Sequence, residues 1–424
     1  MALPLSLVPT STLHGSAPGA GEGSGPRREA SRLLEGLGRA LHRFGTPAHR
    51  LEDALGGISR LLGIEAQFFS TPTAIFVCES TAAGTLTSLH RVEPGDVQLE
   101  KLTALDEILE KVADGTLAPG AALAAVEEVE RAPARYRGWV KVAASILASG
   151  SAARFFGGSS GDVLAAGAVG LLIGLLDRLL ADRPAPRRLF EALAAGSAAF
   201  TATLLAPWWG NSPSVVTVAG LIVLLPGLAV TVAMTELATR HLVSGSARLA
   251  GAAVLFVTLG FGVGLGRELG LRWTGAIPAG TPEPLPAWTE LPFLLVAALA
   301  FTVLFRARPR DLGTILLGGL VAFYGGQAGA ALFGPQLGAF VGAVLVGLAG
   351  NAYARLARRP SAILELPALM LLVPGSLGFQ GVSSLLAHRT VSGVEAAFAT
   401  FLVAAALVAG LLVSNVVLPP RRSL

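Results

Sequence analysis

Charged side chains are scarce in this sequence. Lys, Arg, Asp and Glu make up 14% of the 424 residues, whereas soluble domains carry roughly a quarter. Hydrophobic residues make up 52%, so the composition predicts an integral membrane protein. Cysteine is scarcer still, because the sequence contains only Cys78. One cysteine excludes an internal disulfide and any metal site built from several cysteines.

Motifs that would indicate cofactor or nucleotide chemistry are also missing. The six histidines are scattered and no HExxH pattern frames them, so we expect no metal and no cofactor. No phosphate-binding Walker loop occurs; an ATP-driven pump would need one here or on a partner chain, which favours secondary transport. The basic excess lies in the hydrophobic part of the chain, which indicates arginine at membrane flanks and not nucleic-acid binding.

The charges divide the chain near residue 137. Residues 1–137 hold 30 of the 60 charged residues, and the remaining 287 residues hold the other 30. Residues 1–25 are rich in Ser, Gly, Pro and Thr and predict a disordered tail. Residues 26–137 combine amphipathic helical stripes with short alternating segments, which predicts a small cytoplasmic α+β domain. Thr46 and Pro47 are placed as the N-cap and first residue of one of its helices.

Ten apolar segments follow, most of them long enough to span a bilayer as helices. They lie at about 139–156, 161–180, 189–206, 214–235, 247–266, 291–305, 312–332, 336–356, 361–386 and 394–418. Arginines gather in every second loop, which by the positive-inside rule predicts ten spans with both termini in the cytoplasm. Residues 267–290 form a long external linker in this scheme.

The ten segments contain an internal repeat. Phe156 and Asp162 recur as Phe305 and Asp311 at an offset of 149 residues, and the Pro226-Gly227 pair recurs as Pro374-Gly375 at 148. Each repeat holds five spans, residues 138–266 and 291–418, and five is odd, so the second copy must enter the membrane from the opposite side. The fold predicted is therefore membrane all-α, with ten helices in two inverted five-helix repeats.

The Pro-Gly pairs interrupt the fourth and ninth segments. Proline lacks an N–H and clashes with the preceding turn, and glycine tolerates non-helical angles. Interrupted helices in matching positions of inverted repeats are a pointer to a transporter's substrate site. We therefore assign Pro226, Gly227, Pro374 and Gly375 to a candidate solute site; simple kinks are the alternative.

At these residues the chain resembles the threonine/serine exporter family. The resemblance covers roughly residues 30–418 and includes Gly45-Thr-Pro-Ala-His-Arg-Leu-Glu52, Phe69-Ser-Thr-Pro72, Leu225-Pro-Gly227 and Leu372-Val-Pro-Gly375. The resemblance implies export of small amino acids from the bacterial cytoplasm across the inner membrane, driven by the proton motive force. In some relatives the solute is a dicarboxylate such as succinate, so the solute stays open.

Polar residues inside apolar segments are functional candidates, because burying them in lipid is costly. Glu365, Asp162 and Asp311 are candidates for proton coupling, and Gln327 and Asn351 for hydrogen bonds to the solute. Each carboxylate has a structural alternative: Asp162 and Asp311 as helix caps, and Glu365 as a partner of Arg358 or Arg359. Arg154 is placed to pair with Asp162.

Two other classes of protein compete with the exporter. A membrane-anchored enzyme would place its chemistry on the helix carrying His49, Glu52 and Asp53, although no nucleophile motif accompanies them. A passive channel is the other. We expect no enzyme activity, and as partners a small solute, protons, the bilayer and a second copy in a homo-oligomer.

Overall fold

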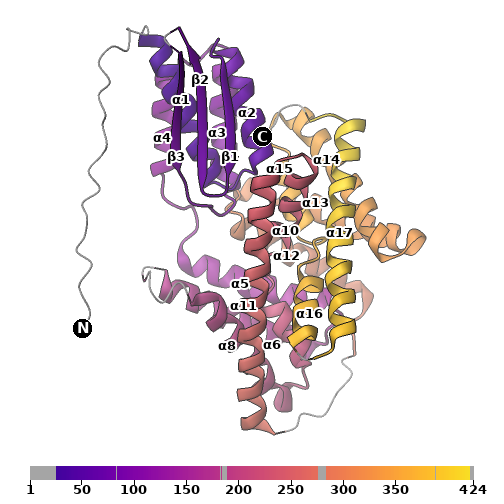
Figure 1. Cartoon of the computed structure of the whole chain (residues 1–424). Coiled ribbons are helices and arrows are strands. Elements are labelled where there is room, and N and C mark those ends of the chain that lie inside the picture. The colour runs from indigo at the N-terminus through magenta and orange to yellow at the C-terminus, as the bar shows by residue number, and fades with distance from the viewer. Residues whose placement is uncertain are drawn as a thin grey trace, which may run out of the picture.

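The computed structural model describes residues 25–82, 84–181, 183, 189–275, 283–386 and 388–420. It has an N-terminal unit of helices and strands standing on a larger bundle of helices (Figure 1). The predicted tail lies outside the described residues except for Gly25, which already begins helix α1.

The N-terminal unit packs helices against one three-stranded sheet. Its strands are antiparallel in the order β1-β2-β3, with Phe69 paired to Phe76. Apolar side chains from α1, α2, β2, α3 and α4 form its own core, including the fully buried Leu37, Leu55 and Leu105. Its elements are α1 (Gly25–Arg43), α2 (Ala48–Leu61), β1 (Ala66–Thr71), β2 (Ala74–Thr81), β3 (Gly84–Arg91), α3 (Leu99–Ala113) and α4 (Pro119–Arg131).

The turn before α2 differs from the sequence prediction. Gly45 adopts a φ of 87°, and Pro47 occupies the N-cap position without a capping side chain among the described residues. The predicted cap by Thr46 is therefore wrong. Thr46 is instead buried where the N-terminal unit meets the helical bundle.

The bundle contains helices at all ten predicted apolar segments. Seven, counted among the described residues, are long and apolar enough to cross a membrane. The other three positions hold α5, which is less apolar, and two helices that are interrupted; the number of spans therefore stays a prediction. The elements are α5 (Gly138–Phe155), α6 (Ser160–Leu180), α8 (Phe190–Trp209), α9 (Pro213–Gly220), α10 (Gly227–Ala238), α11 (Leu242–Thr274), η1 (Ala287–Thr289), α12 (Glu290–Leu304), η2 (Pro309–Asp311), α13 (Leu312–Phe333), α14 (Pro335–Ala357), α15 (Ala362–Leu369), α16 (Gly375–Leu386) and α17 (Thr390–Val417).

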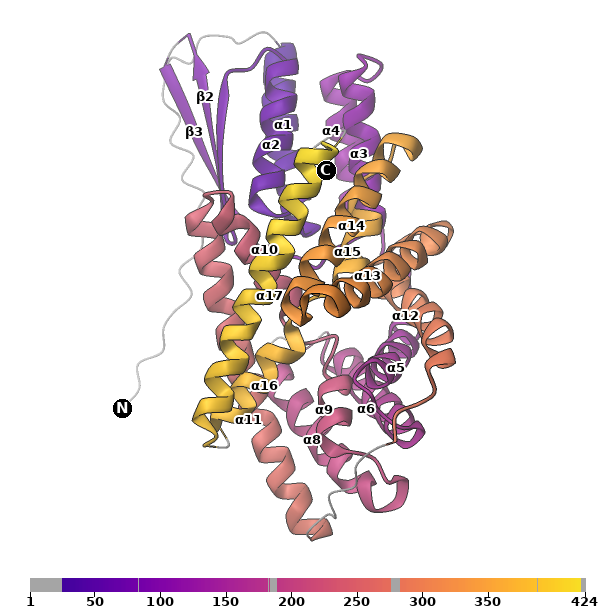
Figure 2. The same ribbon diagram turned by 90° about the vertical axis from the view of Figure 1, so that its right-hand side faces the viewer.

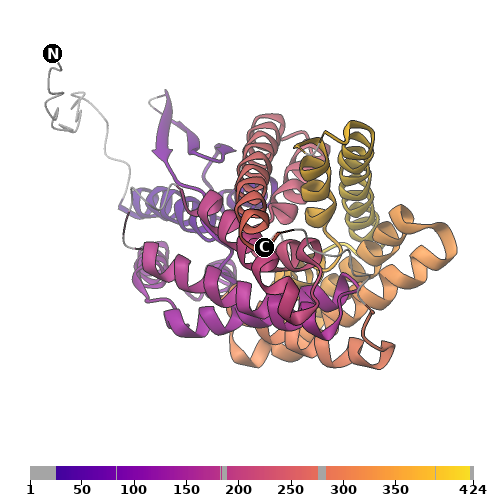
Figure 3. The same ribbon diagram turned by 90° about the horizontal axis from the view of Figure 1, so that it is seen from below.

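The two halves of the bundle exchange contacts. Helix α10 packs on α11 of its own half and on α17 of the other, and α16 packs on α17 and on α11. Helix α11 runs away from the N-terminal unit, whereas α17 runs back towards it (Figures 1 and 2). Seen from below, the first half and the second half occupy different sides of the bundle, with α11 beside the α16–α17 pair (Figure 3).

The N-terminal unit is attached to the bundle through backbone groups. The N–H groups of Leu99 and Glu100, which begin α3, donate to the carbonyls of Phe305 and Arg306 at 2.9 and 3.2 Å. The first N–H groups and last carbonyls of helices have no partner inside their own helix. Here the start of α3 and the end of α12 satisfy each other, and Arg308 adds an ion pair to Glu107 at 2.9 Å.

Candidate functional site

The two interrupted helices meet at their interruptions. A Cβ built on Gly227 would lie 2.9 Å from Cα of Gly375, and one built on Gly375 would lie 3.2 Å from Cα of Gly227. The first contact leaves no room for a side chain on Gly227 unless the backbone shifts, and the second is tight enough that a side chain on Gly375 would push its neighbour by a few tenths of an ångström. The two glycines that the repeat pairs in sequence are therefore in backbone contact in the interior.

The interruptions are true breaks. Helix α9 ends at Gly220 and α10 begins at Gly227, while α15 ends at Leu369 and α16 begins at Gly375. Between them the chain forms turns, with Leu225 N–H donating to Leu221 O at 3.0 Å and Val373 N–H to Leu369 O at 2.9 Å. The alternative of a kinked but continuous helix is wrong at both positions.

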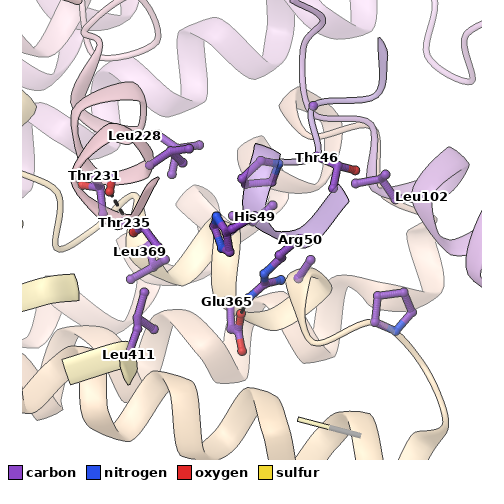
Figure 4. A pocket seen from close by; sticks show the side chains of 16 residues that line it. Thr46, His49, Arg50, Leu102, Leu228, Thr231, Thr235, Glu365, Leu369 and Leu411 are labelled. Carbon is purple, nitrogen blue, oxygen red and sulfur yellow. Dashed lines mark hydrogen bonds and ion pairs between the residues drawn. The ribbon is translucent and has the colours of Figure 1, made fainter. Parts of the chain in front are cut away.

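A small cavity lies between these breaks and the N-terminal unit. Its volume is about 70 Å³, several times what one water molecule requires. The unit contributes the turn before α2 and the start of that helix, and the bundle contributes α10 and α15 (Figure 4). The cavity thus brings together the N-terminal unit and one piece of each interrupted helix.

Glu365 is the buried carboxylate of this cavity. The residue is 3% exposed, and its Oε2 lies 2.9 Å from Nη2 of Arg50, which reaches it from α2. A Cβ built on Gly350 of α14 would lie 2.6 Å from Glu365 Oε1, so the carboxylate packs directly on that glycine. The alternative pairing with Arg358 or Arg359 is wrong, because the cation paired with Glu365 among the described residues is Arg50, and Arg359 pairs with Asp311.

A second buried carboxylate, Glu236 of α10, was not among the sequence candidates. It is fully buried and accepts hydrogen bonds from Ser244 at 3.0 Å and Arg248 at 3.1 Å. Its Oε1 also accepts the Ala48 N–H at 3.0 Å, at the N-terminus of α2. An anion is favourable at that position because the helix N-terminus carries partial positive charge. An acidic residue at the end of an apolar segment was the signal available in sequence.

The histidines at this junction belong to the contact between unit and bundle. Burial lowers the pKa of His49 to about 3, and the nearby Arg50, His241 and Arg248 charges act in the same direction. The His49 and His241 rings lie 6.1 Å apart. His49 is therefore neutral at physiological pH.

The three residues of the competing enzyme hypothesis, all on α2, have different surroundings in the structure. Glu52 accepts the Ser70 N–H at 2.7 Å and lies 3.4 Å from His241, and burial raises the pKa of its carboxyl. Asp53 is exposed, whereas His49 lines the cavity. Among the described residues, no group of three His, Cys, Asp or Glu is placed to hold a metal ion.

Asp162 caps helix α6, as the structural alternative predicted. Its carboxylate accepts the Ser159 N–H at 2.8 Å while its own N–H donates to the Ser159 hydroxyl, and it also accepts the Ser212 N–H at 2.6 Å. The predicted pair with Arg154 is wrong. Arg154 instead donates to Thr289 at 2.6 Å and lies 3.7 Å from Glu290.

The remaining candidates lie apart from the cavity. Asp311 is buried, but its side chain does not cap α13; it pairs with Arg359 at 2.9 Å. Asn351 donates to Asn415 Oδ1 and to the Leu418 carbonyl. Gln327 is exposed on α13. The structure therefore brings Gly227, Gly375 and Glu365 to one region and leaves these three residues outside it.

A bundle of apolar helices in which two interrupted helices meet in the interior is an arrangement typical of membrane transporters. Comparison with known families gives the particular family. Residues 32–270 match the model described as "Putative threonine/serine exporter", and residues 290–417 match "Threonine/Serine exporter, ThrE". The chain belongs to the threonine/serine exporter family, as its motifs indicated.

Curated relatives are fungal membrane proteins. "Pheromone-regulated membrane protein 10" of Debaryomyces hansenii is 28% identical over 383 residues, which cover 86% of this chain and 37% of the relative. The protein of the same name in Saccharomyces cerevisiae is 26% identical, and the match covers 82% of this chain and 46% of the relative. "Uncharacterized protein C7D4.12c" of Schizosaccharomyces pombe is 24% identical, covering 85% and 48%. The chain thus spans less than half the length of each of these relatives. No solved structure matches the chain.

Proposed function

We propose that the chain is a secondary transporter that exports small amino acids, threonine and serine foremost, across a bacterial inner membrane at the expense of the proton motive force. The observation that carries the proposal is the contact between the interrupted helices at Gly227 and Gly375. Non-helical backbone at membrane depth is tolerated only inside protein or beside a polar cavity. Here the cavity that Arg50 and Glu365 line is also lined by Leu228 and Leu369, which flank the two breaks.

The arrangement of the halves supports two inverted repeats. Every element from α5 to α11 has a counterpart from α12 to α17, and the equivalent helices α11 and α17 run in opposite directions (Figure 2). The contacts between the halves are reciprocal: α10 of the first half packs on α17 of the second, and α16 of the second half packs on α11 of the first. Such an arrangement lets one half rock against the other around a fixed site, which gives alternating access.

A buried carboxylate supplies a place for the coupled proton. Glu365 lies on an interrupted helix, is nearly inaccessible and contacts a single cation, Arg50, among the described residues. A carboxylate that exchanges a proton with one side and then the other couples solute export to proton entry. Asp162 and Asp311 are weaker carriers because each is held by a cap or an ion pair.

Transport by purified protein tests the proposal. Proteoliposomes loaded with unlabelled threonine are expected to accumulate labelled threonine by counterflow, and net export against a gradient should stop when an uncoupler is added. The same vesicles loaded with succinate test the dicarboxylate alternative. Conductance without solute dependence would establish a channel and sink the proposal.

A further inference from the structure

We propose that the cavity between α2, α10 and α15 is the binding site for the zwitterionic head of an α-amino acid, with Arg50 holding the carboxylate and Glu365 the ammonium group. The inference deepens the proposed function and rests on it. It makes the N-terminal unit a part of the solute site, because one of the two charges comes from α2.

The charges in the cavity match those of a zwitterion. Arg50 Nη2 and Glu365 Oε2 lie 2.9 Å apart, and the two side chains are 28% and 4% exposed. In this state they neutralise each other. An amino acid inserted between them replaces one charge-assisted contact by two, since its carboxylate accepts from the guanidinium and its ammonium donates to Glu365. A dicarboxylate would bring a second negative charge against Glu365, and such like-charge contact selects against it.

Two polar atoms in the cavity wall lack partners. Thr46 is 7% exposed and its hydroxyl has no hydrogen-bond partner among the described residues, and the same holds for the buried Nδ1 of His49. Buried polar groups are nearly always hydrogen-bonded, so orphaned ones indicate a missing partner. Both residues line the cavity that contains the ion pair. They provide a donor or acceptor for the hydroxyl of a small solute such as threonine.

The rest of the wall limits the size of the solute. Leu228, Leu366 and Leu369 of the lining are apolar. Thr231 and Thr235 line it from α10 with short side chains, on the same side as Leu228 (Figure 4). The hydroxyls of both threonines already donate to carbonyls one turn back, at 3.1 and 2.9 Å. They remain able to accept a hydrogen bond. The lining therefore suits a small side chain with one hydroxyl.

Direct binding to the full-length chain in lipid nanodiscs tests the site apart from transport. The probes are L-threonine, N-acetyl-L-threonine, which lacks the ammonium charge, and L-threoninamide, which lacks the carboxylate. We expect the native chain to bind threonine at least tenfold more tightly than either analogue. Glu365→Gln should lose at least tenfold in threonine affinity but none for the acetylated probe. Arg50→Gln should lose a similar factor in threonine affinity but keep its affinity for L-threoninamide.

A matched ion pair provides the control. Arg308 pairs with Glu107 at the same 2.9 Å and also joins the N-terminal unit to the bundle, so Arg308→Gln should leave all three affinities unchanged. Unchanged threonine binding in folded Glu365→Gln and Arg50→Gln would overturn the site while counterflow by the native chain would keep the transport proposal. If Arg50→Gln does not fold, equal binding of threonine and its acetylated form by the native chain overturns the site. Absence of both binding and counterflow would overturn the two proposals together.

Discussion

His49 shows how burial of one residue makes the docked N-terminal unit sensitive to acid. Its pKa in the folded chain, about 3, lies below the ordinary value of 6.5 because burial disfavours the imidazolium. The unfolded chain therefore takes up the proton first as the pH falls. The stability that depends on neutral His49 is complete above about pH 6.5 and is lost below it, by at most about 1.4 kcal/mol for each pH unit.

We expect the apparent melting temperature of the purified chain to fall between pH 7 and pH 5, and His49→Gln to reduce that fall. His42, whose pKa burial also lowers, accounts for a remaining dependence of the same sign. Scanning calorimetry at the two pH values measures the fall in melting temperature for the native chain and for the variant, and so the slope of each against pH. A variant with the same slope as the native chain would contradict the assignment to His49.

Gly350 fixes the position of Glu365 from behind. Because a Cβ there would lie 2.6 Å from Oε1 of the carboxylate, Gly350→Ala should displace Glu365 from Arg50. We expect a loss of about 1–3 kcal/mol in stability from overpacking and a clear loss of threonine counterflow. Gly251→Ala is the control, because its Cβ would contact nothing within 4 Å among the described atoms. Equal counterflow in the two variants would show that Glu365 needs no such positioning.

At the scale of elements, the two helix breaks occupy equivalent positions in the sequence repeat, so equivalent substitutions at them are expected to have similar effects. Gly227→Ala and Gly375→Ala each place a methyl group against the partner's backbone, at 2.9 and 3.2 Å. We expect both to reduce counterflow strongly and to a similar degree, whereas Gly264→Ala, with open space around it, should not. Counterflow lost in one of the first two variants and retained in the other would argue against a shared hinge at this contact.

The helices were predictable because hydropathy and helix-breaking residues act locally. The apolar segment predicted at 214–235 became α9 and α10, and the one at 361–386 became α15 and α16, with the Pro-Gly pairs at the breaks. The repeat offset alone pairs Gly227 with Gly375, the two glycines that are in contact in the structure. The partner of Glu365 was not predictable, because Arg50 lies 315 residues away and nothing in local sequence specifies docking between separate units. Glu236 was missed because the apolar segment predicted from the sequence ends at residue 235, whereas α10 continues to Ala238.

At the scale of the whole molecule, the membrane orientation is testable through the single cysteine. In a Cys78→Ser background, Trp273→Cys lies near the end of α11, which runs away from the N-terminal unit (Figure 1). Arg310→Cys lies in η2, two residues after Arg308, which pairs with Glu107 of that unit. Both native residues are exposed. We expect an impermeant maleimide added to whole cells to label position 273, and to label position 310 only after permeabilisation. The reverse pattern would place the N-terminal unit outside.

The N-terminal unit occurs once, whereas the proposed five-helix repeat occurs twice in the bundle. It contacts α10 of the first half and α15 of the second, and the repeat equates these helices with α16 and α9. If the two halves are inverted repeats, as proposed, two repeats without the unit would present equivalent entrances, with equal solute affinity, to the two sides of the membrane. The unit covers only one of them and adds a charge, Arg50, that the opposite entrance does not receive from it. In the proposed transporter the single unit therefore makes the two facing forms unequal in energy, so the apparent solute affinity should differ between the two sides of the membrane, while the solute and proton gradients set the direction of net transport.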